Sequence, residues 1–591
     1  MHPDSFYRIR LLKDLFRIVA VPCLLLSALL RIFDRNPGLL TLPLHFLFLV
    51  ASALSRNHYW DWVHAREATR LGAVQIPRVR GKWPGNIDIY FGLVKAAQSR
   101  SLGSYQLDLF EQYQSTTLNL RLLWQDLIIT MDAKHIQGIL ATGFNNFWRG
   151  PRQKERLEVF LGEGIFNRDD DSWKAHRALA RPFFARDRIT DFELFERYTT
   201  TTLALISKFA ATGRPIDVQD LYARFTLDAA SEFLFGKNVA TLASQLPEPG
   251  RARMGAMGSA TDDAFGAFAQ AFEAAQVRVI TRARRGYFWP AFEFFFPDPQ
   301  VRFRRTIDRW VSPLVEDALD NRSSMRKAGL KSSLDQSVFL EYLADSTEDR
   351  KVIQDQLLNI LLASRDTTSS LLTSITYLLS EHPDVTRKLR AEVLAHCGPE
   401  GAPTFATIKS MRYMRAVINE TLRLFPPVPT NARESRPQAS LLPESDGTYH
   451  APARPLYVPP STPFQYLSFL TQRNPALWGA DAAAFDPERW LDARLATFTA
   501  NPMIFTPFSA GPRICIGQNY ALNEASCFLV RLLQQFDSFA LAPDAQPAGS
   551  LPPPAWKAGR GRDPVEKIWP QAALTAFVKG GLWVRFGRAA R

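Results

Sequence analysis

The sequence predicts a mainly α-helical protein with a small β portion, preceded by an N-terminal membrane anchor. Long stretches of the chain keep apolar residues at spacings of three and four, which is the period of a helix, whereas strand-like pieces are few and short. Two apolar runs stand close together near the N-terminus. The composition, 46% hydrophobic and 22% charged, is that of a globular protein rather than of a disordered chain.

The two apolar runs cover residues 18–30 and 37–54. The first is shorter than the ~20 residues of a simple transmembrane helix, and the second is borderline. Basic residues precede and follow the pair, so the positive-inside rule places both flanks in the cytosol; these bases are Arg8, Arg10, Lys13, Arg17, Arg56, Arg66 and Arg70. We expect residues 1–75 to form a membrane hairpin or a single tilted anchor with its approach to the linker.

Two other interpretations of this N-terminal segment exist. A cleavable signal peptide is disfavoured because the apolar run is doubled and lacks a clean small-x-small cleavage site. A buried helical hairpin of a soluble protein remains the alternative. After the runs, residues 76–88 hold two prolines and two glycines, which favours a stiff linker over a helix. We therefore expect the soluble domain to span residues 76–591.

Helical patterns dominate this domain. Residues 197–213 and 217–236 each keep the helical spacing and end at a glycine, and Asp217 is placed to cap the second helix. The strand-like pieces are residues 107–113, 127–132, 454–460 and 582–587.

The net charge limits the classes of partner that the protein is expected to have, and the cysteines indicate its redox compartment. A charge of +13 suits an anionic membrane surface, an acidic protein partner or nucleic acid, and nucleic acid is the least supported because no basic cluster carries a nucleic-acid motif. The four cysteines show no disulfide framework and no metal-type CxxC spacing, which fits a reducing compartment; they are Cys23, Cys397, Cys515 and Cys527.

Cys515 lies in the loop "FSAGPRICIG", just before a long apolar helical pattern that we expect to begin near Gly517. The free N–H groups and the dipole of a helix N-terminus favour an anion, and Arg513 adds a nearby cation. Gly511 and Gly517 would let the backbone approach a flat partner closely. A thiolate ligand is therefore possible, although a buried inert cysteine is the commoner occurrence.

The pattern Phe508-x-x-Gly511-x-Arg513-x-Cys515-x-Gly517 resembles the haem-binding loop of the cytochrome P450 family. Other pieces of the sequence stand in the order that this family has: "WKAHR" (173–177), "ASRDTT" (363–368), "ETLR" (420–423) and "FDPERW" (485–490). The resemblance covers about residues 76–590. It implies the cytochrome P450 fold, haem b as cofactor and the Cys515 thiolate as axial ligand of the haem iron, with the other four residues of the loop pattern around it.

The resemblance also implies roles for residues outside the loop. Trp173 and Arg177, and more weakly Arg433, would hold haem propionates. A buried triad would hold the proximal side in shape; it consists of Glu420, Arg423 and Arg489.

Within "ASRDTT", Thr367 would hold the distal water network and Asp366 would help to deliver protons. The stretch lies in the middle of a predicted helix of about thirty residues, where hydroxyls can bond back to i−4 carbonyls and distort the helix. Ser364 departs from the glycine that the family usually has here, which puts the width of the oxygen groove in doubt. Substrate contacts are expected around Ala363, Ser364, Thr430 and Leu582.

The function implied is that of a haem-thiolate monooxygenase, which inserts one oxygen atom of O₂ into a C–H bond of a lipophilic substrate. Since the chain has no flavin or iron–sulfur motif, electrons would come from NADPH–cytochrome P450 reductase, with cytochrome b5 as a second candidate donor. The resemblance further implies the endoplasmic reticulum membrane, with the catalytic domain facing the cytosol. No nucleic-acid partner is expected.

The substrate class follows from two features of the sequence. Residues 282–299 join bases to aromatics and prolines and suggest a loop that dips into the membrane, although an aromatic corner of the core is the alternative. Residues 172–192 and 470–490 resemble the fungal branch that hydroxylates alkanes and fatty acids. A fatty acid, an alkane or an aromatic hydrocarbon is therefore expected. The competing hypotheses are a haem-thiolate isomerase, dehydratase or peroxygenase, and a non-catalytic haem or lipid binder.

Overall fold

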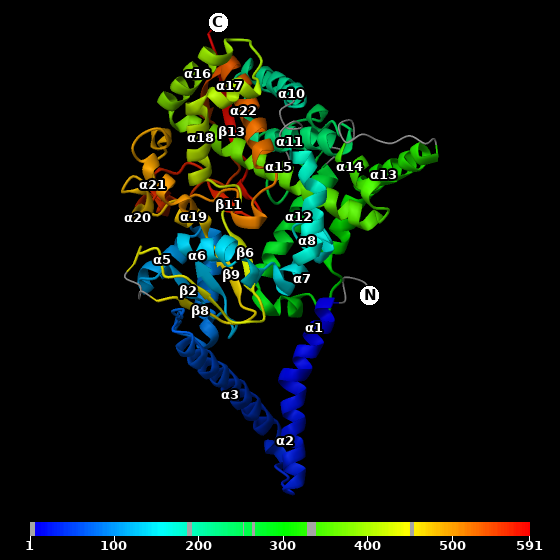
Figure 1. The fold of residues 1–591 in the computed structure, drawn as a ribbon, viewed down its shortest axis with the longest axis vertical. Coiled ribbons are helices and arrows are strands. Elements are labelled where there is room, and N and C mark those ends of the chain that lie inside the picture. Colours follow the sequence, from blue (N-terminus) through cyan, green and yellow to red (C-terminus); the bar gives the residue numbers. More distant parts are fainter. Residues whose placement is uncertain are drawn as a thin grey trace.

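The computed structural model describes residues 6–185, 192–251, 253–262, 266–327, 338–449 and 454–590. Its body combines a helix-rich part and a smaller β-rich part, from which two N-terminal helical legs project as a V (Figure 1). The predicted class, mainly α with a small β portion, is confirmed.

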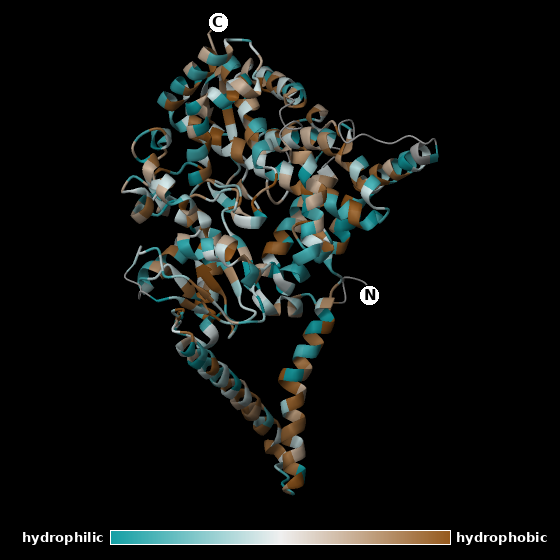
Figure 2. Ribbon diagram, viewed as in Figure 1, coloured by the Kyte–Doolittle hydropathy of each residue, from teal (hydrophilic) through white to brown (hydrophobic). Residues whose placement is uncertain are grey.

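The first leg runs through α1 (Phe6–Leu15), a π-helical turn and α2 (Val21–Ile32), and the second leg is α3 (Thr41–Arg70). Both are long and apolar enough to cross a membrane, over Phe6–Ile32 and Gly38–Arg70. Figure 2 shows α2 and the adjoining part of α3 as mostly hydrophobic. Large apolar side chains stand exposed there, such as Leu24 and Leu42, so the legs are not a buried soluble hairpin.

The helices of the body surround one central helix, α15 (Arg350–Glu381), which contacts α11, α13, α14, α16, α18 and α22. The others are α4 (Ile87–Ser99), α5 (Ser104–Tyr113), α6 (Ala133–Gln137), α7 (Gly150–Leu161), α8 (Asp170–Ala180), α10 (Glu193–Ala210), α11 (Val218–Phe235), α12 (Gly266–Arg284), α13 (Pro299–Lys327), α14 (Phe339–Ser346), α16 (Pro383–Cys397), α17 (Phe405–Ser410), α18 (Arg412–Leu424), α19 (Ser468–Thr471), α20 (Pro475–Trp478), α21 (Leu495–Ala500) and α22 (Gln518–Gln535).

The β portion consists of small sheets. The largest has the order β2-β3-β9-β6-β4, and the others have the orders β1-β8-β7, β10-β13-β5 and β11-β12. The strands are β1 (Val74–Gln75), β2 (Thr117–Asn119), β3 (Ile128–Thr130), β4 (Phe147–Trp148), β5 (Ile216–Asp217), β6 (Asn431–Ser435), β7 (Ser440–Leu442), β8 (Leu456–Val458), β9 (Pro463–Tyr466), β10 (Phe536–Leu541), β11 (Pro570–Ala572), β12 (Ala576–Val578) and β13 (Trp583–Arg588).

Most local predictions are confirmed and one is wrong. Strands β3, β8 and β13 lie where strand-like pieces were expected, and the Asp217 side chain accepts the Gln219 N–H as the predicted N-cap of α11. Residues 107–113, predicted as a strand, belong to helix α5. The apparent alternation at their start hides a spacing of three, Leu107–Phe110–Tyr113, which places these side chains on one face of a helix.

The core is packed where α22 and α11 meet. The Phe528 ring lies 5.1 Å from that of Tyr222 and 5.0 Å from that of Phe225, measured between ring centroids. These side chains belong to one buried cluster that also takes in α15 and α18. The packing places α22, and with it the Cys515 loop at its start, against the central helix.

One buried carboxyl group in this contact predicts a pH effect. Burial raises the pKa of Glu524 in α22 from 4.5 to about 8, although the Thr368 hydroxyl on α15 opposes the shift. The folded protein therefore binds a proton that the unfolded chain releases, so the free energy of unfolding should fall as the pH rises from about 5 to about 8. The variant Glu524→Gln, which mimics the protonated group, should lose this dependence; denaturant unfolding at pH 6 and pH 8 measures it. An unchanged slope in the variant would contradict the assignment.

Candidate active site

The Cys515 loop is held by a close backbone contact. Gly511 has φ +66°, and a Cβ there would lie 1.9 Å from the carbonyl oxygen of Leu140, so only glycine fits. The Cys515 N–H donates to the Phe508 carbonyl at 2.9 Å, which closes the loop. Helix α22 follows with Gly517 as its N-cap, as predicted. The Cβ of a residue 517 would meet nothing closer than 3.6 Å, so this glycine is under less constraint.

Cys515 borders space inside the protein. Its side chain is exposed by surface area, yet protein surrounds it closely enough that burial raises its pKa, while the Gly517 backbone and Arg177 act to lower it. Both descriptions hold for a thiol that lines an internal cavity. Among the described residues, no three His, Cys, Asp or Glu side chains come together as a metal site would require.

The middle of α15 also borders an opening. Between residues 355 and 379, every side chain is buried except Ala363, Ser364 and Thr367, which are partly exposed. The Ser364 hydroxyl donates to the Ile360 carbonyl at 3.0 Å and the Thr367 hydroxyl to the Ala363 carbonyl at 2.6 Å. These are the expected back-bonds, but the helix stays α-helical throughout rather than being distorted. Because the Ser364 hydroxyl is bound to its own helix, the side chain protrudes little from the helix.

Asp366 lies on another face of α15. It accepts hydrogen bonds from Gln276 of α12 and from Arg365, both at 2.7 Å. Arg365 in turn donates to the Ser259 hydroxyl at 2.7 Å. Asp366 is buried in this network, whereas Thr367 reaches the opening. The structure therefore does not bring the two predicted catalytic residues onto one face.

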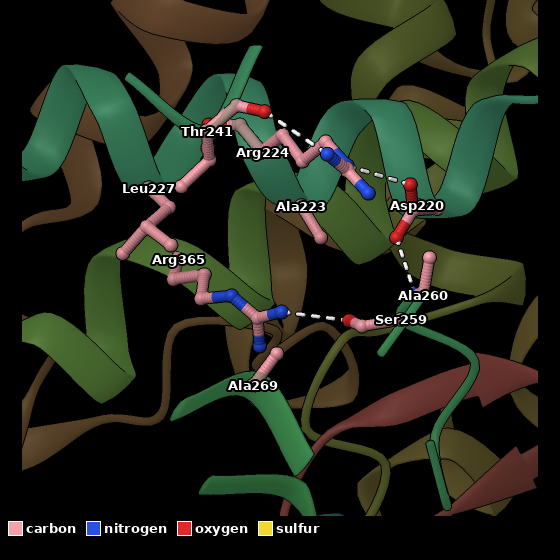
Figure 3. Close-up of a pocket in the computed structure, with 9 residues that line it drawn as sticks. All are labelled: Asp220, Ala223, Arg224, Leu227, Thr241, Ser259, Ala260, Ala269 and Arg365. Carbon is pink, nitrogen blue, oxygen red and sulfur yellow. Dashed lines mark hydrogen bonds and ion pairs between the residues drawn. The ribbon is translucent and has the colours of Figure 1, made fainter. Parts of the chain in front are cut away.

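A small cavity lies beside this network, with room for about one water molecule. Figure 3 shows Arg365 and the Asp220–Arg224 ion pair around it. The Nε of Arg365 is buried and has no hydrogen-bond partner. A water in this cavity would satisfy that group.

An arginine cluster forms another wall of the site. Burial, and after it Arg433 and Arg513, lowers the pKa of Arg149 well below its usual value. Burial followed by Arg433 likewise lowers the pKa of Arg513 to about 10. The carboxylate of Asp169 accepts from Arg513 at 2.7 Å and from the backbone N–H of Arg149 at 2.9 Å. The three guanidinium groups thus lie close enough to repel one another while the Asp169 carboxylate pairs with that of Arg513, and the surplus positive charge calls for an anion.

Trp173 and Arg177 adjoin this cluster. The Arg513 guanidinium lies over the Trp173 ring, 4.4 Å from its centroid. Arg177 is near enough to Cys515 for the two charges to influence each other. The guanidinium surplus and the cavity-lining thiol fit a planar group that carries two carboxylates and a metal, as haem b does.

Arg149 is a residue that sequence reasoning missed. It stands outside every quoted motif, and its only local signal is the following Gly150, which has φ +78°. A Cβ at Gly150 would lie 2.7 Å from the Cβ of Glu434. This contact with β6 sets the turn that carries Arg149 beside Arg433.

The Glu420 network lies in the protein interior. Glu420 accepts two hydrogen bonds from Arg423, at 2.7 and 2.8 Å, and one from the Trp490 indole at 3.0 Å. Arg489 is its second ion-pair partner, at 3.4 Å. Arg423 also donates to the carbonyls of residues 472, 482 and 484, so the network ties α18 to the irregular segment before the Cys515 loop. All three charged residues are buried, and their placement is that of a structural brace.

Two of the expected substrate contacts, Thr430 and Leu582, lie in different surroundings. Thr430 is partly exposed just before β6. Leu582 is only 1% exposed and packs in the hydrophobic core against α11, so the structure does not bring it to the opening. A glycine pair before β13 suggested a turn facing the pocket, but β5 pairs with β13 and covers its start.

Replacing Cys515 tests the metal assignment. The variant Cys515→Ser should lose the reduced carbon-monoxide band of a thiolate-ligated haem, because a hydroxyl does not supply the sulfur ligand. The spectrum of purified full-length protein measures this. Cys527→Ser is the matched control, since that thiol is fully buried in the core and burial raises its pKa. A wild-type protein that binds haem without this band would contradict the assignment.

Replacing Arg149 tests the cluster. We expect Arg149→Met to lower the ratio of bound haem to protein, with haem lost about tenfold faster to a competing acceptor, because one charge-assisted contact is removed. The partly exposed Arg436 is a control: it pairs with Asp170, and Arg436→Met should retain haem. Equal haem loss in both variants would show that Arg149 holds no propionate.

Comparison with known proteins identifies the family. The profile described as Cytochrome P450 matches residues 83–558. The chain is 35% identical to Cytochrome P450 52-E3 of Starmerella bombicola, over 82% of this chain and 90% of the relative. It is 37% identical to Cytochrome P450 monooxygenase himC of Aspergillus japonicus over 73% of each, and 33% identical to Cytochrome P450 52A3-B of Candida maltosa over 77% of this chain and 83% of the relative. The chain therefore belongs to the cytochrome P450 family of haem-thiolate monooxygenases, whose cofactor is haem b.

Proposed function

We propose that this protein hydroxylates long-chain lipophilic substrates, namely fatty acids, alkanes or aromatic hydrocarbons, at the membrane of the endoplasmic reticulum. The observation that carries the chemistry is the combination of one cavity-lining thiol, Cys515, with an arginine cluster whose charge Asp169 neutralises only in part. The substrate class is supported by the resemblance to the fungal alkane and fatty-acid branch and by the two membrane helices. The catalytic domain faces the cytosol in this proposal.

When bound, haem supplies the activation of O₂ and the transfer of one oxygen atom to a C–H bond. The protein's own residues bind and orient it: Cys515 donates the thiolate, and the guanidinium groups of Arg149, Arg433 and Arg513 pair with the propionates. Arg177 beside Cys515 favours the deprotonated thiol. The Thr367 hydroxyl, at the opening of α15, can exchange its bond to Ala363 for one to a water and so position a proton.

Substrate entry from the bilayer is supported by the segment between α12 and α13. Its aromatic residues divide into two groups. Trp289 is buried under Arg282, whereas Phe292, Phe295 and Phe296 are 58%, 86% and 68% exposed. The buried end of the segment thus corresponds to the alternative, an aromatic corner of the core, and the exposed end corresponds to the predicted membrane loop. Exposed phenylalanines beside arginines suit the boundary between lipid headgroups and acyl chains.

Electron transfer from an acidic partner is supported by a groove beside α22. It has a volume of ≈ 510 Å³ and lies between α17, α18, α21 and the first turns of α22. Its charged lining residues are Lys409, Arg412 and Arg415, and it contains no carboxylate. Since Asn519, four residues after Cys515, also lines it, a partner bound there would approach the thiolate side of the cofactor. We propose NADPH–cytochrome P450 reductase, and cytochrome b5 as a second donor, for this surface.

The competing activities make a different prediction. A haem-thiolate isomerase, dehydratase or peroxygenase needs neither reductase nor O₂, and a non-catalytic binder makes no product. The family membership favours the monooxygenase. Proton delivery through Thr367 would have no use in an isomerase.

The test is product formation by the full-length protein in vesicles with reductase, NADPH and a fatty acid or alkane. We expect hydroxylated product that requires both reductase and O₂. The double variant Arg412→Glu with Arg415→Glu should raise the KM for reductase about tenfold, because reversed charges slow association, while peroxide-supported turnover stays as in the wild type. Product without reductase, or no product from any of the three substrate classes, would contradict the proposal.

A further inference from the structure

The first turns of the first leg, in α1, are docked on the catalytic domain. Tyr7 and Leu11 of α1 are only 2% and 6% exposed, in contrast to the exposed apolar residues further along the same leg. The partner surface consists of α7 and the short helical segment Gly286–Phe292, here called the aromatic segment. A free N-terminal tail would not be buried in this way.

The docking contacts are specific. The Tyr7 ring lies 4.7 Å from the Trp289 ring. The Arg10 guanidinium donates to both carboxylate oxygens of Glu155 in α7, at 2.9 and 3.1 Å. The Tyr287 hydroxyl donates to Asp14 at 2.8 Å. An ion pair, a hydrogen bond and the contact of two tilted rings fix the orientation of α1 rather than merely cover an apolar surface.

The second leg returns to the same body. The Tyr457 hydroxyl of β8 donates to Glu67 near the end of α3, at 2.9 Å, and Arg78 pairs with Asp61 at 2.7 Å. Tyr59, Trp60 and Trp62 stand half-exposed just before these contacts, as aromatic residues do at a membrane interface. Between the legs, Ser27 and His45 are joined by a hydrogen bond of 3.0 Å.

The lengths of the legs fit a bilayer. The stretch from Leu39 to Tyr59 holds about twenty residues, which at 1.5 Å each span about 30 Å, the thickness of the hydrocarbon core. The apolar run of the first leg, residues 18–30, is shorter and spans about 20 Å, a mismatch that local thinning of the bilayer accommodates. The turn that joins them is polar and lies at the far tip of the V (Figure 1). Seven basic residues flank the legs on the domain side, whereas near the tip there are two, Arg31 and Arg35. By the positive-inside rule, this excess on the domain side agrees with a cytosolic domain.

We propose that both legs cross the membrane as a hairpin, that the N-terminus lies on the side of the catalytic domain, and that α1 holds the aromatic segment in place. A single span, with the N-terminus on the opposite side, would pull Tyr7, Arg10 and Asp14 away from all their partners. The partner of the exposed faces of the legs is the lipid bilayer. This inference concerns topology and holds whatever the substrate is.

The experiment uses full-length protein in sealed microsomes, with an epitope tag ahead of Met1. Proteinase K added outside should remove the tag while a luminal marker stays intact. A tag that is removed only after detergent is added would overturn the hairpin. The readout needs no catalytic activity, so its failure is distinct from failure of the proposed function.

A charge exchange tests the docking of α1. Arg10→Glu and Glu155→Arg, made singly, should each speed proteolytic cleavage within α1 about tenfold, because proteolysis follows the population of the undocked state. The double variant, which restores the pair in reverse, should return the rate towards that of the wild type. Glu400→Arg, the same change at an exposed position away from the legs, is the control. Equal rates in all variants, with haem content unchanged, would overturn the docking.

Discussion

The arginine cluster beside the Cys515 loop holds more positive charge than the Asp169 carboxylate neutralises, and the active site depends on that imbalance. Arg149, Arg433 and Arg513 lie near one another, the Asp169 carboxylate pairs with Arg513, and burial lowers the pKa values of Arg149 and Arg513. Desolvated guanidinium groups without a counter-ion are costly, so the bound cofactor supplies stability as well as chemistry. The sheet that carries Arg433 and the turn at Gly150 place the guanidinium groups beside one another, and the fold thereby maintains this unfavourable arrangement.

The Glu420 network presents the opposite case. Its two arginines face a carboxylate, an acidic neighbour and several backbone carbonyls, so the polar groups of Arg423 are well satisfied. A compensated network of this kind specifies one arrangement of the chain and needs no ligand. The molecule thus places a self-sufficient brace on one side of the Cys515 loop and an unsatisfied cluster on the other. The loop between them is fixed by the contact of Gly511 with the Leu140 carbonyl.

Sequence reasoning reached those features whose physics is local. The Cys515 loop, the Glu-x-x-Arg pair and the capped helix after Asp217 each have their partners within a few residues or in a recurring pattern. Arg149 was missed because its role arises from packing against β6, almost three hundred residues later. Leu582 was placed at the pocket because the glycine turn before it was visible, whereas the strand β5 that covers it was not. The short run of residues 107–113 fits both the two-residue period of a strand and the three-to-four-residue period of a helix. Only the burial of its side chains in the folded protein shows that it is a helix.

The attachment of the V-shaped legs at two separate places on the body has a consequence for encounters in the plane of the membrane. A domain tethered by one flexible stem can swivel, and a partner must wait for the correct orientation. Two attachment points, at β8 and at the aromatic segment, fix the distance of the basic groove from the membrane surface and the direction in which it faces. A membrane-bound electron donor then searches in two dimensions for a target whose orientation is already settled. The linker between the donor's membrane anchor and its catalytic domain must therefore hold that domain at the same distance from the membrane.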